Sequence, residues 1–312
     1  MPARTTEQRM LNAVQHPEIY EEVIIESKGV PVALSIWKGQ TGSPCIIFLP
    51  GTMTHPLFYE EFLDGLALAG FNVVGVHLQG HGKSPRTRQL FSLQDLVQNA
   101  RDAITYTLNR FESEIIVLGS SQGGVIAMAL AGSDPRPGLV VAHNILNPQL
   151  PASLSITRFP RWFKPAYPVM RQGIKLGARL LPRLPLPIGF YLQPERIFRT
   201  KWASEQYQQD PLSLTSYPLY FLASLFNADM SCLASGQIKC PVVVVASTGD
   251  TLFPYDYTRQ VYEQIVAPTK ELLLYELKGH LIFNEDVEEV LPAIVSTINP
   301  YLVKKVQVKA KA

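Results

Sequence analysis

The chain of 312 residues is long enough for two domains, or for one large α/β core that carries an insertion. Its 28 Lys and Arg residues nearly balance 26 Asp and Glu residues, and a net charge of +2 argues against a protein that coats nucleic acid. Hydrophobic residues make up 46% of the chain and charged residues 17%, which excludes a disordered chain. We therefore expect a globular protein with no nucleic-acid partner.

The cysteines and the lengths of the apolar runs indicate the cellular compartment of the protein. Cys45, Cys232 and Cys240 are an odd number at spacings that match no zinc or disulfide framework, so we expect reduced packing residues. The first twenty residues lack the apolar block of a secretion signal, and no run reaches the roughly 18 apolar residues of a spanning helix. We expect a cytoplasmic protein.

From residue 45 onward, short apolar runs alternate with longer helix-like segments. The first four runs are CIIFLP (45–50), FNVVGV (71–76), EIIVLG (114–119) and LVVAHNIL (139–146). The pattern resumes with PVVVVAS (241–247), a helix near 255–265, ELLLYEL (271–277) and a closing helix from about 285 to 303. Apolar runs unbroken by polar residues suit strands buried on both faces. The sequence therefore predicts an α/β fold, with a mostly parallel central sheet and helices on both faces.

One segment, residues 149–237, interrupts this pattern before the last two strands. Its first part, 149–204, holds ten Lys and Arg residues and one acid, Glu195, for a net charge of +9. Eight prolines in the same part break it into short helices and loops. We interpret 149–237 as a helical lid on a core formed by residues 1–148 and 238–312.

The run EIIVLGSSQGG places a predicted strand directly before a serine between glycines. Ser121 is centred between Gly119 and Gly123, whereas Ser120 is not. A serine at such a strand-to-helix turn sits on a strained backbone that only small neighbours tolerate, and its hydroxyl points away from the sheet. We interpret Ser121 as the apex of a nucleophile elbow. The alternative is a Gly/Ser turn that only caps a helix.

A serine hydroxyl is a poor nucleophile at neutral pH, so a histidine has to accept its proton and an acid has to hold that histidine in the right tautomer. Among six histidines, only His280 lies late in the chain, just after the last predicted strand. A loop at that point can carry it over the edge of the sheet. His280 is the predicted base, against the alternative of an ordinary surface loop residue.

The predicted acid is Asp250, which directly follows the strand at 241–247. Sites in parallel sheets form at the carboxyl ends of the strands. The loop after the preceding strand, NILNPQL (144–150), offers no carboxylate for the other common placement of the acid. Asp256 is the reserve candidate, and a turn-forming or helix-capping role is the alternative for Asp250.

The chain order Ser121, Asp250, His280 is the order of α/β-hydrolase triads. Over residues 40 to 305 the sequence resembles that superfamily, and most of all its monoacylglycerol lipase and serine aminopeptidase branch. The segments LPGTMTHPLFYEEFLDGLALAGFNVVGVHLQGHGKSP and ASTGDTLFP carry the resemblance further. It implies an oxyanion hole made by the backbone N–H groups of Thr52 and Gln122.

Two positions depart from the family pattern. Pro50 stands where the family has a histidine before the oxyanion glycine, and His77 stands where it has an aspartate. Neither change removes a member of the triad, but both bear on the oxyanion loop. His77 and His81 have a spacing that suits a metal on a helix, yet Gly80 and Gly82 favour a loop, so we expect no metal and no cofactor.

The predicted lid contains an amphipathic, basic helix from Tyr167. Its apolar positions are Met170, Ile174, Gly177 and Leu181, and its cationic ridge is Arg171, Lys175 and Arg179. One interpretation is a lid that rests on an anionic membrane. The other is an apolar face packed on the core, with a solvated basic face.

We expect the inner face of the lid to line an apolar cleft above Ser121, which favours acyl chains over sugars or charged peptides. The candidate substrate-binding residues are Met53, Phe190, Tyr191, Tyr217, Tyr220 and Phe221.

The leading hypothesis is a serine carboxylic ester hydrolase that cleaves a small lipid-like monoester, such as a monoacylglycerol or lysophospholipid, through an acyl-enzyme. A thioesterase or acyltransferase acting on acyl-CoA or carrier-bound acyl groups is the alternative, since the basic insertion suits a nucleotide phosphate equally well. A non-catalytic binding protein of the same fold is a third hypothesis. Dehalogenase chemistry is disfavoured because it needs a carboxylate where Ser121 stands.

Overall fold

The computed structural model describes residues 12–309, with side chains as far as Pro300. Its centre is an eight-stranded sheet of order β1-β2-β4-β3-β5-β6-β9-β10. The strands are β1 (Tyr20–Ser27), β2 (Val30–Trp37), β3 (Cys45–Leu49), β4 (Asn72–His77), β5 (Ile115–Ser120), β6 (Pro137–His143), β9 (Val242–Ser247) and β10 (Lys270–Tyr275). The first two strands pair antiparallel and β2 pairs antiparallel with β4, whereas all pairs from β4 to β10 are parallel.

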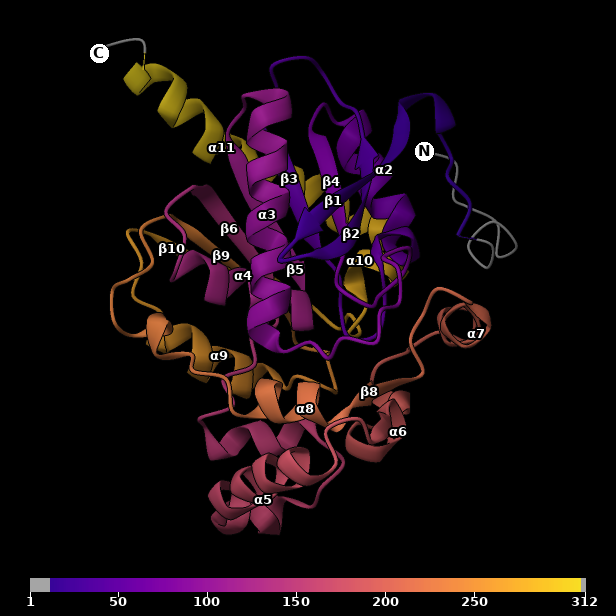
Figure 1. Ribbon diagram of the computed structural model, residues 1–312. Helices are drawn as coiled ribbons and strands as arrows, with labels where there is room; N and C mark the ends of the chain where they lie inside the picture. Colours follow the sequence, from indigo (N-terminus) through magenta and orange to yellow (C-terminus); the bar gives the residue numbers. More distant parts are fainter. Residues whose placement is uncertain (1–11, 310–312) are drawn as a thin grey trace.

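Helices cover both faces of this sheet. They are α2 (Glu60–Leu68), α3 (Leu93–Phe111), α4 (Gln122–Ala131), α9 (Tyr255–Gln264), α10 (Ile282–Glu285) and α11 (Val287–Lys309), with 3-10 turns η1 (Pro17–Ile19) and η2 (Pro56–Tyr59). In Figure 1, α3 crosses in front of the strands next to α4, and α11 runs behind them against α2. The central strands β3, β5 and β9 are buried throughout because both of their faces are covered. The predicted fold class is confirmed.

Residues 149–237, here called the insertion, separate β6 from β9. They form η3 (Pro151–Ile156), η4 (Arg161–Ala166), α5 (Tyr167–Leu180), β7 (Pro185–Pro187), α6 (Ile188–Tyr191), η5 (Pro194–Arg196), α7 (Lys201–Gln209), β8 (Ser216–Pro218), α8 (Leu219–Phe226) and η6 (Ser231–Leu233). Figure 1 shows α5, α6 and α8 together at one end of the sheet, below the carboxyl ends of its parallel strands. The expected core also includes residues 1–11 and 310–312, which lie outside the described residues.

The described part of the chain bears on two further expectations. The three cysteines are buried and unpaired with one another, as expected for packing residues. Between residues 12 and 309, no helix combines the length and the apolar character that a bilayer crossing requires.

Candidate active site

Ser121 stands at the sharp turn between β5 and α4, with φ +54° and ψ −113°. A Cβ on Gly119 would lie 2.1 Å from the carbonyl oxygen of Gly123, and a Cβ on Gly123 would lie 1.9 Å from the carbonyl oxygen of Leu49. Both positions therefore need glycine, which is the steric reason for the spacing around the serine. The turn holds the strained serine with its side chain beyond the edge of the sheet.

His280 and Asp250 come within hydrogen-bonding reach of this serine, from the loops after β10 and β9. His280 Nε2 lies 3.1 Å from Ser121 Oγ, and His280 Nδ1 lies 2.8 Å from Asp250 Oδ2. Because a carboxylate only accepts, Nδ1 carries the proton and Nε2 is left to accept the serine proton. All three side chains are buried.

The Asp250 carboxylate is surrounded by donors. Its Oδ1 atom accepts 2.8 Å hydrogen bonds from the N–H groups of Leu252 and Phe253. Burial by itself would raise the pKa of Asp250, but the charge and hydrogen bond of His280 and the Phe253 N–H hold that pKa below its ordinary value. The carboxylate is thus ionised at neutral pH. The reserve candidate Asp256 is exposed in the first turn of α9 and stays outside the site.

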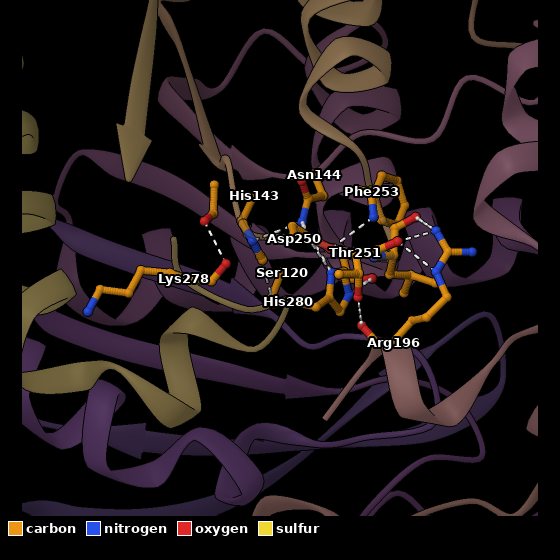
Figure 2. Close-up of polar contacts among 12 residues, drawn as sticks. Ser120, His143, Asn144, Arg196, Asp250, Thr251, Phe253, Lys278 and His280 are labelled. Carbon is orange, nitrogen blue, oxygen red and sulfur yellow. Dashed lines mark hydrogen bonds and ion pairs between the residues drawn. The ribbon is translucent and has the colours of Figure 1, made fainter. Parts of the chain in front are cut away.

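Two residues at the end of β6, which the sequence analysis did not single out, complete the surroundings of the acid (Figure 2). Asn144 Nδ2 donates to Asp250 Oδ2 at 2.8 Å. His143 is fully buried with its ring 5.7 Å from that of His280, and burial together with repulsion from His280 lowers the pKa of His143 to about 3. The only signal in the sequence was their place at the carboxyl end of a strand, next to the strand that bears Asp250.

Arg196, from the insertion, forms hydrogen bonds with the loop that carries Asp250. Its Nε donates to the Thr251 carbonyl oxygen at 2.6 Å, and Nη2 bonds the carbonyls of Thr251 and Leu252. In return, Thr251 Oγ1 donates to the Arg196 carbonyl oxygen at 3.3 Å. Figure 2 shows the guanidinium reaching across to this loop. The insertion thus contacts the main chain directly after Asp250.

The predicted oxyanion donors belong to Thr52, in the loop after β3, and to Gln122, the first residue of α4. Both residues line a pocket with Ser121, and Thr52 Oγ1 donates to Gln122 Oε1 at 3.4 Å. The Gln122 N–H also stands at the positive end of a helix, which favours a developing negative charge. Both residues therefore lie beside the serine, and their role as oxyanion donors stays a prediction.

His77, which replaces the family's aspartate, is a buried structural residue. Its Nδ1 accepts the N–H of Lys83 at 3.0 Å, so Nε2 carries the proton toward Ser35 Oγ at 2.9 Å. Burial, with repulsion from His55 and Lys83, holds the pKa of His77 well below its usual value, and the ring is neutral. Within the described residues, no group of three metal-binding side chains occurs.

His55 ties the same region to the insertion. Its Nε2 lies 2.5 Å from Asp210 Oδ2, and both side chains are fully buried. Burial alone would raise the pKa of Asp210, but the contact with His55 and donors from Leu212 and Ser213 hold that pKa below its ordinary value. The oxyanion loop is thus anchored to the turn that follows α7.

A pocket at Ser121 and a chamber in the insertion share part of their walls. The first is a pocket with walls that include Thr52, Gln122, Val125, Leu146, Tyr191 and Phe226, and none of the described side chains that line it is charged. The second is a chamber of about 420 Å³ enclosed entirely by residues of the insertion, from η3, α5, α6 and α8. Thr157, Tyr191 and Phe226 line both spaces. The pocket at the serine and the chamber in the insertion therefore adjoin one another.

Of the six candidate substrate-binding residues, the structure places only Tyr191 in the pocket at Ser121. Phe190 is 52% exposed and borders the chamber alone, and Tyr220 is 40% exposed on another side of α8. Neither residue lines the pocket at Ser121, and their expected role in substrate binding stays a prediction.

Met53, Tyr217 and Phe221 also lie outside the pocket, since they are buried behind it. The Phe221 ring packs 5.2 Å from that of Phe91 in the core, and the Tyr217 hydroxyl is bonded to the backbone of Met53. Sequence reasoning missed the apolar residues that do line the pocket. These are Val125, Leu146, Ile156, Leu192, Leu225, Phe226, Leu252 and Phe253.

On α5, the helix begins at Tyr167 as expected. Met170, Ile174 and Gly177 face the chamber inside the insertion and not the catalytic core, whereas Leu181 is exposed. The apolar face is therefore shared between a cavity and the solvent.

Comparisons with known proteins agree with one another. The model of the family described as serine aminopeptidase, S33, matches residues 42–287. A monoacylglycerol lipase of Mycolicibacterium smegmatis is 24% identical over 280 residues, which are 88% of this chain and 95% of that protein. A phospholipase of Bacillus subtilis is 21% identical over 273 residues, 85% of this chain and 99% of that protein.

Solved structures show the same fold. The monoacylglycerol lipase of Paleococcus ferrophilus superposes with a TM-score of 0.71 at 24% identity, over 86% of this chain and 99% of that one. A soluble variant of the Saccharomyces cerevisiae monoglyceride lipase, bound to a substrate analog, superposes with a TM-score of 0.72 at 17% identity, over 93% and 97% of the two chains.

Proposed function

Since the chain belongs to the α/β-hydrolases of the serine aminopeptidase S33 family, in the branch of the monoacylglycerol lipases, we propose that it is a serine carboxylic ester hydrolase acting on a lipid-like acyl monoester. One observation carries the proposal. Ser121, His280 and Asp250 form an unbroken hydrogen-bonded series, with separations of 3.1 and 2.8 Å. This is the arrangement that activates a serine hydroxyl as a nucleophile.

In the proposed cycle, Ser121 Oγ attacks the ester carbonyl carbon while His280 Nε2 takes its proton. The carbonyl oxygen becomes an anion that the N–H groups of Thr52 and Gln122 stabilise, and loss of one such donor typically costs about 3 kcal/mol in the barrier. His280 then protonates the departing alcohol, and Ser121 keeps the acyl group. Water, deprotonated by His280, cleaves the acyl-enzyme and releases the acid, while Asp250 stabilises the imidazolium at both steps.

The uncharged walls of the pocket support an acyl chain as the substrate group. In this proposal the chain passes Tyr191 and Phe226 into the chamber, and the insertion acts as a lid. The sixteen residues that line the chamber include one charged side chain, Arg171, which suits a hydrocarbon better than a sugar or a charged peptide.

The decisive test is Ser121→Ala, with turnover of a p-nitrophenyl ester and labelling by a fluorophosphonate as the readouts. We expect both to disappear. Ser120→Ala is the matched control, because it removes the neighbouring buried hydroxyl, whose contact is His143 at 3.5 Å. Retention of more than a few per cent of the wild-type rate by Ser121→Ala would refute the proposal, and a wild-type protein that fails to label would favour a non-catalytic binding protein.

A thioesterase or acyltransferase is the second candidate, favoured by the net charge of +9 over residues 149–204. A cationic surface attracts the phosphates of acyl-CoA as well as lipid headgroups. Rates on a monoacylglycerol and on an acyl-CoA of the same chain length separate the two. A dominant preference for the thioester would replace the ester assignment.

The surface of the insertion also supports peripheral contact with an anionic membrane. On α5, Val169, Leu176 and Leu180 are 72%, 58% and 73% exposed. At 100° per residue, these three side chains fall on one stripe of the helix, beside the cationic ridge of Lys175 and Arg179. An exposed apolar stripe next to cations is the pattern of a helix that lies in a lipid interface. A cytoplasmic location stays a prediction.

A further inference from the structure

The oxyanion loop contains a strained residue. Met53 is fully buried and has a left-handed backbone with φ +61°, which a non-glycine residue adopts only at an energetic cost. It is the third residue of a turn closed by the Thr54 N–H on the Gly51 carbonyl oxygen at 3.2 Å. Turns with a positive φ at this position normally place glycine or asparagine there. Something outside the turn must therefore hold Met53.

The insertion supplies that support on both sides of Met53. The Met53 N–H donates to Tyr217 Oη at 2.8 Å, and the Met53 carbonyl oxygen accepts the Leu214 N–H at 2.9 Å. Both partners precede α8, more than 150 residues further along the chain. Neither polar group of this buried residue is satisfied by its own loop.

The orientation of the Tyr217 hydroxyl follows from a chain of hydrogen bonds. His81 Nδ1 faces the Gln79 carbonyl oxygen at 2.9 Å, and because a carbonyl only accepts, Nδ1 carries the proton. His81 Nε2 therefore accepts the Tyr217 proton at 2.7 Å. Burial lowers the pKa of His81 to about 4, so the ring stays neutral at neutral pH. Because the Tyr217 hydroxyl donates its proton to His81, its oxygen accepts the hydrogen bond from the Met53 N–H.

The bond from Met53 to Tyr217 fixes the middle peptide of the turn. A turn of this kind relaxes by rotating the peptide between its second and third residues, here Thr52 and Met53, which removes the positive φ. That rotation would turn the Met53 N–H away from Tyr217 and the Thr52 carbonyl to the other face of the turn, so the bond to Tyr217 holds the turn in one form and ties the loop that carries Thr52 to the insertion. In the present geometry the Gly51 carbonyl points to Thr54, so the Thr52 N–H in the same trans peptide points the opposite way.

We propose that Tyr217 is a positioning residue that holds Met53 in its left-handed conformation and so keeps the loop that carries the Thr52 N–H in place beside Ser121. This inference rests on the proposed function, because it assigns Thr52 a role in that reaction. Tyr217 acts through Met53 and touches no reacting atom. Its strand β8 pairs with β7, which leads into α6 and Tyr191, so the oxyanion loop is complete only when the insertion is docked on the core.

The test is Tyr217→Phe, assayed on a short soluble p-nitrophenyl ester. We expect kcat to fall about tenfold or more, by comparison with the hundredfold or greater loss on removing an oxyanion donor, while KM is unchanged. The Ki of an alkyl trifluoromethyl ketone, whose adduct with Ser121 carries the oxyanion, should rise by the same factor. If the role of Tyr217 were only structural, neither kcat nor the Ki of the ketone would change.

Tyr257→Phe is the matched control, because the Tyr257 hydroxyl is also buried and also accepts a backbone N–H, that of Asn147, at 2.9 Å. We expect a similar loss of thermal stability with kcat retained. His81→Phe removes the acceptor of the Tyr217 proton and should lower kcat in the same direction, so it tests the inference if Tyr217→Phe does not fold.

The inference is overturned if Tyr217→Phe keeps kcat within twofold of wild type, or if Tyr257→Phe loses as much. Failure of this inference alone leaves an active wild type and an inactive Ser121→Ala. Failure of the proposed function leaves a wild type without turnover, and the positioning role then falls with it.

Discussion

Asn144 donates a 2.8 Å hydrogen bond to Oδ2 of Asp250, the same oxygen that accepts the Nδ1 proton of His280. Asn144→Asp would place a second carboxylate against this oxygen. Two carboxylates in contact do not both ionise readily, so the pair would keep a proton to higher pH than Asp250 alone. We expect the acidic limb of the kcat/KM profile to move to higher pH.

Asn144→Ala separates charge from the lost hydrogen bond. It removes the donor without adding a carboxylate, so kcat should fall at every pH while the acidic limb stays in place. Profiles of both variants on one p-nitrophenyl ester make the comparison. An unmoved limb in Asn144→Asp would contradict the prediction.

Gly177 gives access to the chamber from the middle of α5. A Cβ there would meet only Leu219 Cδ2, at an ordinary 3.4 Å, so a larger side chain fits and fills the cavity. We expect Gly177→Phe to displace two or three methylenes of a long acyl chain, at about 0.8 kcal/mol each, and so to lower kcat/KM for a C16 ester roughly thirtyfold. A C4 ester should be unaffected.

The control at the same position is Gly177→Ala. It brings a gain in helix propensity of about 0.5–1 kcal/mol without filling the chamber. The measurement is the ratio of C16 to C4 rates in the two variants. Equal losses on both esters in Gly177→Phe would show that the acyl chain does not enter the chamber.

The exposed stripe of α5 predicts a lipid-dependent association. Wild type should sediment with vesicles that contain phosphatidylglycerol, more weakly with phosphatidylcholine alone, and less at high salt because the cationic ridge is screened. The double variant Leu176→Glu, Leu180→Glu should lose this binding, since it places two anions in the apolar stripe.

Ile24→Glu is the control for the vesicle experiment. Ile24 is 63% exposed on β1, an edge strand of the sheet, so its change adds one charge without altering α5. We expect it to bind as wild type does. Equal binding of the α5 double variant and wild type would rule out this surface.

Three buried histidines predict a fall in stability on mild acidification. His77, His81 and His143 have pKa values below the ordinary 6.5, with His81 at about 4 and His143 at about 3, mainly because burial disfavours their charged forms. The unfolded chain binds protons at these sites below pH 6.5 while the folded chain does not. The free energy of unfolding should therefore fall between about pH 6.5 and 4, by about 1.4 kcal/mol per pH unit for each histidine.

The carboxylates affect the stability of the fold at lower pH than the histidines do. The pKa values of Asp210 and Asp250 are depressed on folding, so their stabilising contribution is present above about pH 4 and is lost only below it. His16, whose pKa its hydrogen bond to Asp64 raises, changes the free energy of unfolding only above about pH 6.5, where the unfolded chain has lost the proton that the folded chain still holds.

Urea unfolding at pH 7.5, 6 and 5 measures how steeply the free energy of unfolding changes with pH. The variant His143→Phe should lower this slope by about 1.4 kcal/mol per pH unit, the contribution of one histidine. A free energy of unfolding that is constant over this range would contradict the assignment of neutral buried rings.

The parts of the site that could be predicted are those that residues close together in the chain encode. The glycines at 119 and 123 identified Ser121 because the sterics of a sharp turn act between residues close in the chain. Apolar runs predicted the parallel sheet, and in a parallel sheet the loops after neighbouring strands share one edge, so Asp250 and His280 were expected near the serine.

The parts that depend on how the insertion folds could not be predicted from a local pattern. Whether Tyr217 lines a pocket or supports a loop depends on how β8 and α8 are rotated against the core, and short proline-bounded elements carry no periodicity that predicts such a rotation. Arg196 and Asn144 likewise gained their partners through contacts 55 and 106 residues away in the chain. Such contacts are set by the packing of whole elements, which no local pattern records.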